Sequence, residues 1–216
     1  MLPNYQKLSN GLIKQLEIKN AIEYNPEYVL NRYSSDSFIA NGLGIKMSYL
    51  RLGYLLGVLG FTPNSILDYG YGNGDFLKAC QNFIGDVNGH DISNYPVPDG
   101  ASFIIDPYAR AFDVVCFFDV LEHFQNPYEI KGLKTNYIYI SVPNCHYFSD
   151  DWFDTWKHRR PDEHLWHFNV ESLVNFFSEI GYECIGLSNI EDTIRKDKNA
   201  QEGKYSNILT GVFKKK

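Results

Sequence analysis

The sequence predicts an α/β protein with a doubly wound, mostly parallel seven-stranded sheet and helices on both faces. From Ser65 onward, short apolar runs alternate with stretches that can form helices, a pattern typical of βαβ units. Several of these runs are apolar without strict alternation, as expected of strands that helices cover on both sides. The seven runs are 65–70, 86–92, 102–106, 112–118, 136–142, 183–190 and 207–213.

Three helices are expected between these runs, at 75–83, 127–134 and 170–180. The last of them follows Asn169, a favourable N-cap, and stops at Gly181, a favourable C-terminal residue. The link 107–111 is too short for a crossover helix. The two final strands are expected to form an antiparallel hairpin pair.

The chain divides into residues 1–60, expected to form a helical N-terminal cap, and residues 61–216, expected to form the α/β domain. An apolar window at 43–61 contains Lys46, Arg51 and four glycines, which favours a packed helix over a membrane span. The segment 145–168 is too polar for a core and too aromatic for a disordered linker. We therefore expect it to be an ordered, functional loop.

Composition narrows the class of protein. A net charge of −6 gives little electrostatic support for binding nucleic acid. The four cysteines are scattered without a CxxC pair, which indicates reduced, structural thiols. The first residues lack a cationic region followed by an apolar stretch. We expect a cytoplasmic protein, monomeric or homodimeric, with neither nucleic acid nor membrane as a partner.

The strongest motif is DYGYGNG, Asp68 to Gly74, where a predicted strand gives way to a helix. Glycines there allow a tight turn and let a ligand lie against bare backbone. The spacing departs from the dinucleotide pattern GxGxxG, because Asp75 occupies the position of the third glycine. Asp68 adds a carboxylate that suits an ammonium group and would repel a pyrophosphate.

Two further acidic residues follow the next two strands. Asp91 stands about twenty residues after Gly70, where an acid can accept both hydroxyls of a ribose. Asp106 ends the third strand and can accept a hydrogen bond from an adenine amino group, while Ile92 packs on the ring. A nucleoside with an amino-acid tail fits these positions.

With these motifs the chain resembles the class I S-adenosylmethionine-dependent methyltransferases, especially the group with small-molecule O-methyltransferases of quinone biosynthesis. The resemblance covers about residues 60 to 190, through DYGYGNG, GHDIS, FDVVCFFDVLEHF, ISVPN and EHLWHF. It implies that S-adenosylmethionine is the cofactor. The implied cofactor-binding residues are Asp68, Gly70, Tyr71, Gly72, Asp91, Ile92, Asp106, Phe118 and Asp119.

The acceptor is expected to be a small molecule, methylated on an oxygen of a metabolite or sugar. Histidine titrates near neutral pH and suits the role of base. His146 is preferred and His123 is the second candidate, because each follows a strand end. The substrate-binding candidates are Tyr33, Asn144, His164 and Trp166.

No metal site is expected. The spacing H-x5-H-x2-H of His158, His164 and His167 matches no zinc pattern, and metal-assisted catechol methylation would want acidic residues at two strand ends. Two other functions remain open: an oxidoreductase that binds a nicotinamide dinucleotide, and a non-catalytic module that binds the cofactor or a partner.

Overall fold

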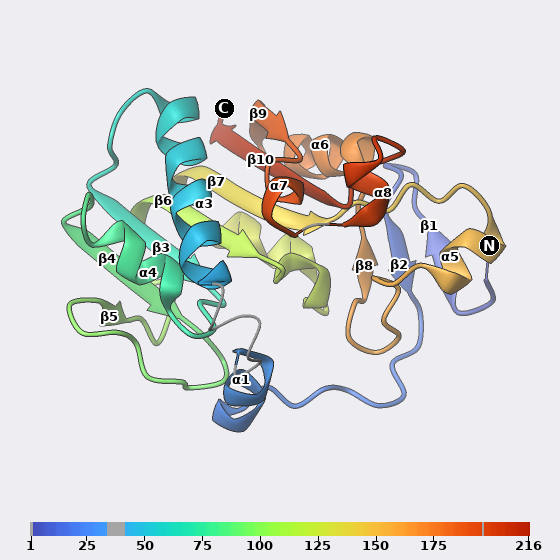
Figure 1. Cartoon of the computed structure of the whole chain (residues 1–216), viewed down its shortest axis with the longest axis horizontal. Coiled ribbons are helices and arrows are strands. Elements are labelled where there is room, and N and C mark those ends of the chain that lie inside the picture. The colour runs from blue at the N-terminus through green and yellow to red at the C-terminus, as the bar shows by residue number, and fades with distance from the viewer. Residues whose placement is uncertain (1, 34–41, 196) are drawn as a thin grey trace.

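The computed structural model describes residues 2–33, 42–195 and 197–216. Its centre is a seven-stranded sheet with the strand order β5-β4-β3-β6-β7-β10-β9 (Figure 1). In chain order these strands are β3 (Ser65–Tyr69), β4 (Asp86–His90), β5 (Ser102–Phe103), β6 (Ala111–Phe118), β7 (Lys134–Pro143), β9 (Tyr182–Ser188) and β10 (Ile208–Lys215).

Most neighbouring strands in this sheet are parallel. β3 pairs in parallel with β4 and with β6, and β6 pairs in parallel with β7. β10 runs antiparallel to both β7 and β9. The predicted fold class is therefore confirmed, including the final antiparallel pair. The chain passes from β5 to β6 through a turn without a helix, as the short link predicted.

Alternate residues of β6 face opposite layers of the protein. Val114 and Cys116 pack in a core with residues of α3 (Leu43–Leu59) and α4 (Asp75–Cys80). Val115 and Phe117 pack in the other core, with residues of α6 (Val170–Glu179). All four of these strand residues are fully buried. Helices thus cover both faces of the sheet, which explains the continuous apolar run in the sequence.

The predicted helix after Asn169 forms as α6 because both of its ends carry strong signals. The Asn169 side chain accepts a hydrogen bond from the Ser172 amide at 2.8 Å. The Ser172 hydroxyl accepts one from the Asn169 amide at 2.9 Å, which completes a capping box. Past the other end, Gly181 has φ 93°, a left-handed conformation that glycine adopts without strain.

The first fifteen residues differ from the predicted helical cap. They contain the strands β1 (Tyr5–Lys7) and β2 (Ile13–Gln15), which pair antiparallel, and β2 also pairs with β8 (Trp166–His167). Figure 1 shows this small sheet beside the main sheet. Strands of three residues carry too little periodicity to be predicted. Further along residues 1–60 the helices α1 (Pro26–Tyr33) and α3 agree with the expectation.

The segment between β7 and α6 is ordered, as expected, and it contains regular elements. The N-cap of α5 (Asp150–Thr155) is Ser149, whose hydroxyl accepts a hydrogen bond from the Trp152 amide. β8 follows this helix. The predicted helix at 127–134 is a 3-10 helix, η2 (Pro127–Gly132). The remaining short helices are η1 (Leu121–His123), α7 (Asp192–Arg195) and α8 (Lys198–Gln201).

None of the helices built from the described residues combines the length and apolarity needed to cross a bilayer. The 17-residue α3 is apolar on nearly every side, and five of its residues are buried against the domain. It therefore acts as a packed helix, as the sequence predicted.

We expect Asn169→Ala to lower the free energy of unfolding by about 1 kcal/mol, because it leaves the Ser172 amide without its cap. Urea denaturation followed by circular dichroism measures the change. Asn169→Ser is the matched control: it keeps an oxygen acceptor and should remain within about 0.5 kcal/mol of the wild type. Equal losses for both variants would show that the cap contributes little.

Candidate active site

The glycine loop between β3 and α4 lies at the carboxyl end of β3, which stands between β4 and β6 in the sheet. Gly70 and Gly72 have φ 80° and φ 56°, and the Gly70 amide donates to the His90 carbonyl at 2.6 Å. A Cβ on Gly70 would overlap the Val120 side chain, and one on Gly72 would overlap the Tyr33 hydroxyl. The loop therefore requires glycine for both its conformation and its space, and it presents bare backbone.

Asp68 lies under this loop and is fully buried. Its Oδ1 has no hydrogen-bond partner among the described residues. Burial raises the pKa of the Asp68 carboxyl to about 7, against the opposing effect of Arg51 and with a smaller contribution from Asp91. A buried carboxylate oxygen without a partner costs free energy unless a cation or donor reaches it. The position thus fits a ligand with an ammonium group.

Asp91 follows β4 and helps to shape the glycine loop. Its Oδ2 accepts a hydrogen bond from the Gly72 amide at 3.0 Å, and its Oδ1 accepts one from the Ser93 amide at 2.8 Å. Each carboxylate oxygen has a second lone pair that can accept from a ligand hydroxyl. Asp68, the loop and Asp91 therefore come together at one edge of the sheet, as the sequence predicted.

The outer part of this edge is exposed. The Ile92 side chain is 64% exposed, an unusual position for a large apolar residue. Asp106 is also exposed, and its Oδ1 accepts from the Tyr108 amide at 2.9 Å. An apolar side chain on the surface next to the loop is available to pack on a planar ring.

Tyr71, a predicted cofactor-binding residue in the glycine loop, has its side chain in the core. Its ring is buried in the core with α4, close against Gly89, and its hydroxyl donates to the Tyr95 carbonyl. The side chain is therefore used for packing, and only the backbone of Tyr71 is left to face a ligand.

Tyr33, at the end of α1, reaches the same loop. Its hydroxyl lies over Gly72, at 2.5 Å from where a Cβ would stand. Burial raises the pKa of Tyr33 to about 12, so the hydroxyl keeps its proton at neutral pH. The structure thus brings this predicted substrate-binding residue to the glycine loop.

A group of charged side chains, buried to different degrees, includes Asp119 at the end of the neighbouring strand β6. Asp119 follows β6 with φ 56°, and Arg195 of α7 donates to its carboxylate. Arg51 of α3 stacks on the Phe118 ring, 4.1 Å from its centroid. Burial alone would raise the pKa of Asp119, but Arg195 and Arg51 outweigh it and hold the pKa well below its usual range.

Glu191 completes this group, which we call the buried ion cluster after its one fully buried member: Arg51, Asp119, Glu191 and Arg195. Glu191 is fully buried and accepts from Arg51 Nε at 2.7 Å and from Arg195 Nε at 2.9 Å. The Ser141 hydroxyl of β7 also donates to it. Glu191 and Arg195 were not predicted, because a four-residue helix leaves no periodic signal and Glu191 is 140 residues away from its partner Arg51.

The preferred base, His146, lies in an aromatic environment beyond β7. Its Nε2 is 2.8 Å from the Ser206 carbonyl, and its ring stacks on Phe148. Asn144 contacts the same serine, with Nδ2 donating to the Ser206 hydroxyl at 2.6 Å, and its buried Oδ1 has no partner among the described residues. The structure therefore brings these two predicted residues together.

The second base candidate, His123, forms a different group with Glu122 and His164. One ligand atom from each of the three lies within 4.8 Å of the other two. Burial raises the pKa of Glu122 well above its usual range and lowers the pKa of His164 to about 2. Glu122 was not singled out in the sequence, because its convergence with His164, a residue distant in the chain, leaves no local signal.

Trp166 was predicted to bind substrate, and its contacts indicate packing instead. It is buried in the core beside α6, and its Nε1 donates to the Phe124 carbonyl at 2.8 Å. With its polar atom satisfied and its ring enclosed, it has no surface left for a ligand.

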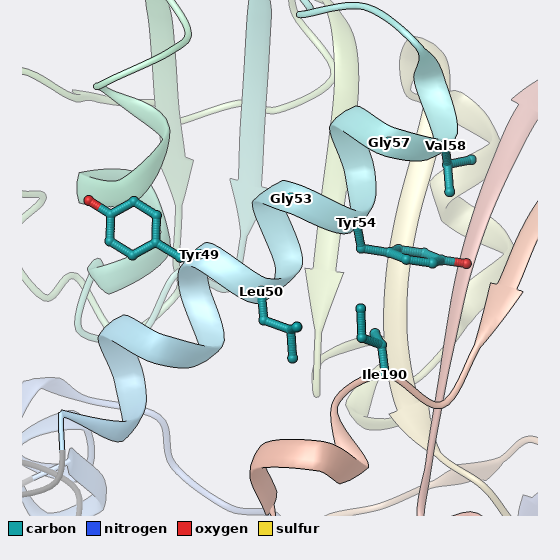
Figure 2. Close-up of a pocket in the computed structure, with 7 residues that line it drawn as sticks. All are labelled: Tyr49, Leu50, Gly53, Tyr54, Gly57, Val58 and Ile190. Atoms are coloured by element: carbon teal, nitrogen blue, oxygen red, sulfur yellow. The ribbon is translucent and has the colours of Figure 1, made fainter.

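A separate apolar groove of about 540 Å³ lies along the outside of α3. Figure 2 shows Leu50 and Tyr54 of this helix facing Ile190 across it, with Gly53 and Gly57 along the helix. None of its lining residues belongs to the glycine loop or the buried ion cluster.

A family model described as a methyltransferase domain matches residues 48–187, which include the glycine loop, Asp91 and the histidines up to His167. The chain belongs to this methyltransferase domain family. Methyltransferases of this fold take the methyl group from S-adenosylmethionine, and the unpartnered Asp68 oxygen and the bare loop fit that cofactor. The match decides against the nicotinamide and non-catalytic alternatives.

Solved structures agree on the fold of this methyltransferase. The methyltransferase in a complex with the Haloferax volcanii Trm112 methyltransferase activator is 17% identical, with a TM-score of 0.57 over 83% of this chain and 96% of that one. The plantazolicin methyltransferase BpumL, in complex with a substrate analogue and SAH, is 16% identical, with a TM-score of 0.58 over 88% and 90%. No curated protein sequence matches the chain significantly.

We expect Gly70→Ala to destabilise the methyltransferase by about 1–3 kcal/mol, because the new Cβ overlaps Val120 and alanine is strained at φ 80°. Gly57→Ala is the control: nothing lies within 4 Å of its Cβ position in α3. That variant should gain about 0.5–1 kcal/mol from helix propensity. Urea unfolding of both variants checks the pair, and a stable Gly70→Ala would contradict the described loop.

Proposed function

We propose that this methyltransferase transfers a methyl group from S-adenosylmethionine to an oxygen of a small metabolite or sugar. The main support for the donor site is Asp68, which is buried beneath a loop of bare backbone. Its Oδ1 has no hydrogen-bond partner among the described residues. In this proposal Asp68 binds the ammonium group, the backbone from Gly70 to Gly72 lies along the methionine part, and Asp91 accepts the ribose hydroxyls.

The adenine would lie at the exposed part of the same edge. Ile92, already at the surface, would pack on one face of the ring, and Asp106 would accept from the amino group. Burying the exposed Ile92 side chain against an aromatic ring is favourable, because it removes apolar surface from water. The backbone of Tyr71 would complete the loop.

The bound cofactor supplies an activated methyl group on a sulfonium centre. The protein residues then have to align the acceptor and keep water out, where alignment can contribute about 7–11 kcal/mol to lowering the barrier. Phe118, held by Arg51, and Asp119, held by Arg195, form a rigid wall at the methionine end. The Tyr33 ring over Gly72 is suited to the role of an aromatic neighbour of the sulfonium.

His146 is the proposed base for the acceptor hydroxyl. A hydrogen bond from its Nε2 to the Ser206 carbonyl would select the tautomer with a lone pair on Nδ1. Asn144, with its unpartnered Oδ1, would orient the acceptor beside it. The proposal also keeps the cytoplasmic location and the monomeric or homodimeric state that the sequence predicted.

We expect Asp91→Ala to weaken binding of S-adenosylhomocysteine by about 1.5–3 kcal/mol, because two hydroxyls lose a charged acceptor. Isothermal titration calorimetry measures this. Asp91→Asn is the control for the loop, since its amide oxygen can still accept from the Gly72 amide. It should bind more tightly than Asp91→Ala, and an unchanged affinity in Asp91→Ala would remove Asp91 from the site.

The pKa of Asp68 predicts a pH dependence of cofactor binding. The free protein holds a proton on Asp68 below pH of about 7, whereas the complex needs the carboxylate to be charged. Affinity for S-adenosylhomocysteine should therefore rise by up to about tenfold per pH unit towards pH 7 and level off above it. Arg51 and Asp91 are the charged neighbours of this carboxyl.

Asp68→Asn is the matching variant, since it keeps the size of the side chain without the titrating group. It should bind S-adenosylhomocysteine more weakly than the wild type at pH of about 8 and show no rise in affinity between pH of about 5.5 and about 7. Calorimetry over this range checks both proteins. A parallel pH dependence in the two would mean that another group titrates.

A further inference from the structure

The cluster of Glu122, His123 and His164 contains the ligand types of a metal site. One carboxylate and two imidazoles, with an open fourth position, form a set found in catalytic zinc sites. Their ligand atoms lie within 4.8 Å of one another. Atoms bound to one zinc ion lie about 3.3 Å apart, so side-chain movements of about 1 Å would complete the set.

Two of the three proposed ligands, Glu122 and His164, have ligand atoms without a hydrogen-bond partner among the described residues. Glu122 is 1% exposed, and neither of its carboxylate oxygens has a hydrogen bond. No ion pair found in residues 2–33, 42–195 and 197–216 includes it. The Nδ1 of His164, which is 4% exposed, is also buried without a partner. Buried, unsatisfied polar atoms on two converging side chains are expensive, and a bound cation would satisfy both.

His123 is held in the orientation typical of a metal ligand. Its Nδ1 lies 2.9 Å from the Glu163 carbonyl, so the hydrogen-bond network assigns a proton to Nδ1 and leaves a lone pair on Nε2. The hydroxyl of Tyr24 lies 2.9 Å from the same nitrogen. Histidine ligands of metals commonly donate their other ring N–H to a backbone carbonyl in this way.

Backbone contacts hold the three side chains together, although they come from two distant parts of the chain. The Leu165 amide donates to the Glu122 carbonyl at 2.8 Å, which joins the segment before β8 to η1. The His164 amide donates to the Arg160 carbonyl at 2.8 Å, and the rings of His123 and His164 meet edge to face at 4.7 Å. The nearby charge of Arg160 is paired with Glu163. The site is therefore built into the fold.

We propose that Glu122, His123 and His164 bind a divalent transition-metal ion, with zinc as the representative. η1 follows β6 directly after Asp119, so the ion would stand on the acceptor side of the methionine end. Its open coordination position would bind the acceptor oxygen; this role, unlike the binding of the ion, rests on the proposed function. The proposal replaces the expectation from sequence that the chain has no metal site.

The test is calorimetric titration of Zn²⁺ into the full chain after dialysis against EDTA. The wild type should bind one ion. Glu122→Gln and His164→Gln should each weaken binding at least about 100-fold, because each removes a ligand. His167→Gln is the matched control: this histidine is equally buried, and its Nε2 also lacks a partner, but it lies outside the cluster. It should bind Zn²⁺ like the wild type.

The same samples are titrated with S-adenosylhomocysteine, and their folding is checked by thermal melting. Wild type that binds S-adenosylhomocysteine and no Zn²⁺ would overturn the metal site while leaving the proposed function intact. A wild type that binds Zn²⁺ and does not bind S-adenosylhomocysteine would support the metal site and contradict the proposed function. If one variant fails to fold, the other still decides, and a folded variant that binds Zn²⁺ as tightly as the wild type refutes the proposal.

Discussion

The reversal of strand order at β3 is the constraint on which the site depends. From β3 the chain passes through α4 to β4 on one side and later returns to place β6 on the other. The loops that leave the carboxyl ends of β3 and β6 therefore diverge, and open α/β sheets bind their ligands at such a point. The glycine loop, Asp91 and Asp119 belong to three different strand ends, and this reversal brings them together.

The buried ion cluster fixes the relative positions of the elements beside that point. Its two arginines and two carboxylates sum to zero charge, and they join α3, the end of β6 and α7, with Ser141 of β7 as a further contact. Loss of an arginine partner would leave the charge of the buried Glu191 carboxylate unpaired in the interior, which is destabilising. The cluster thus favours one relative position of these elements over others, and it fixes Phe118 through the stacked Arg51.

Sequence patterns predicted the sheet and the meeting of the glycine loop with Asp91 because both depend on local signals. Apolar runs identify buried strands, and the glycine loop with Asp68 and Asp91 follows from residue types at strand ends. The small sheet of β1, β2 and β8 was missed because its pairing joins Ile13 to His167. Trp166 and Tyr71 were predicted to contact ligands, because a sequence shows that a residue is aromatic and does not show whether its ring is buried.

The acceptor side could be predicted only in part. His123 and His164 were chosen as separate residues with separate roles, since 40 residues lie between them in the sequence. Their meeting with Glu122 depends on the backbone hydrogen bond from Leu165 to Glu122, which no spacing rule describes. Arg51 was considered only as an obstacle to membrane insertion, because its partners Glu191 and Asp119 are distant in the chain.

The position of β10 between β7 and β9 affects the order in which the protein can assemble. β9 precedes β10 in the chain, yet it reaches the sheet only through hydrogen bonds to β10. As the polypeptide leaves the ribosome, β9 has no edge to join until residues 208–215 have also emerged. Completion of the sheet therefore waits for β10, and until then the apolar edge of β7 is open to intermolecular pairing.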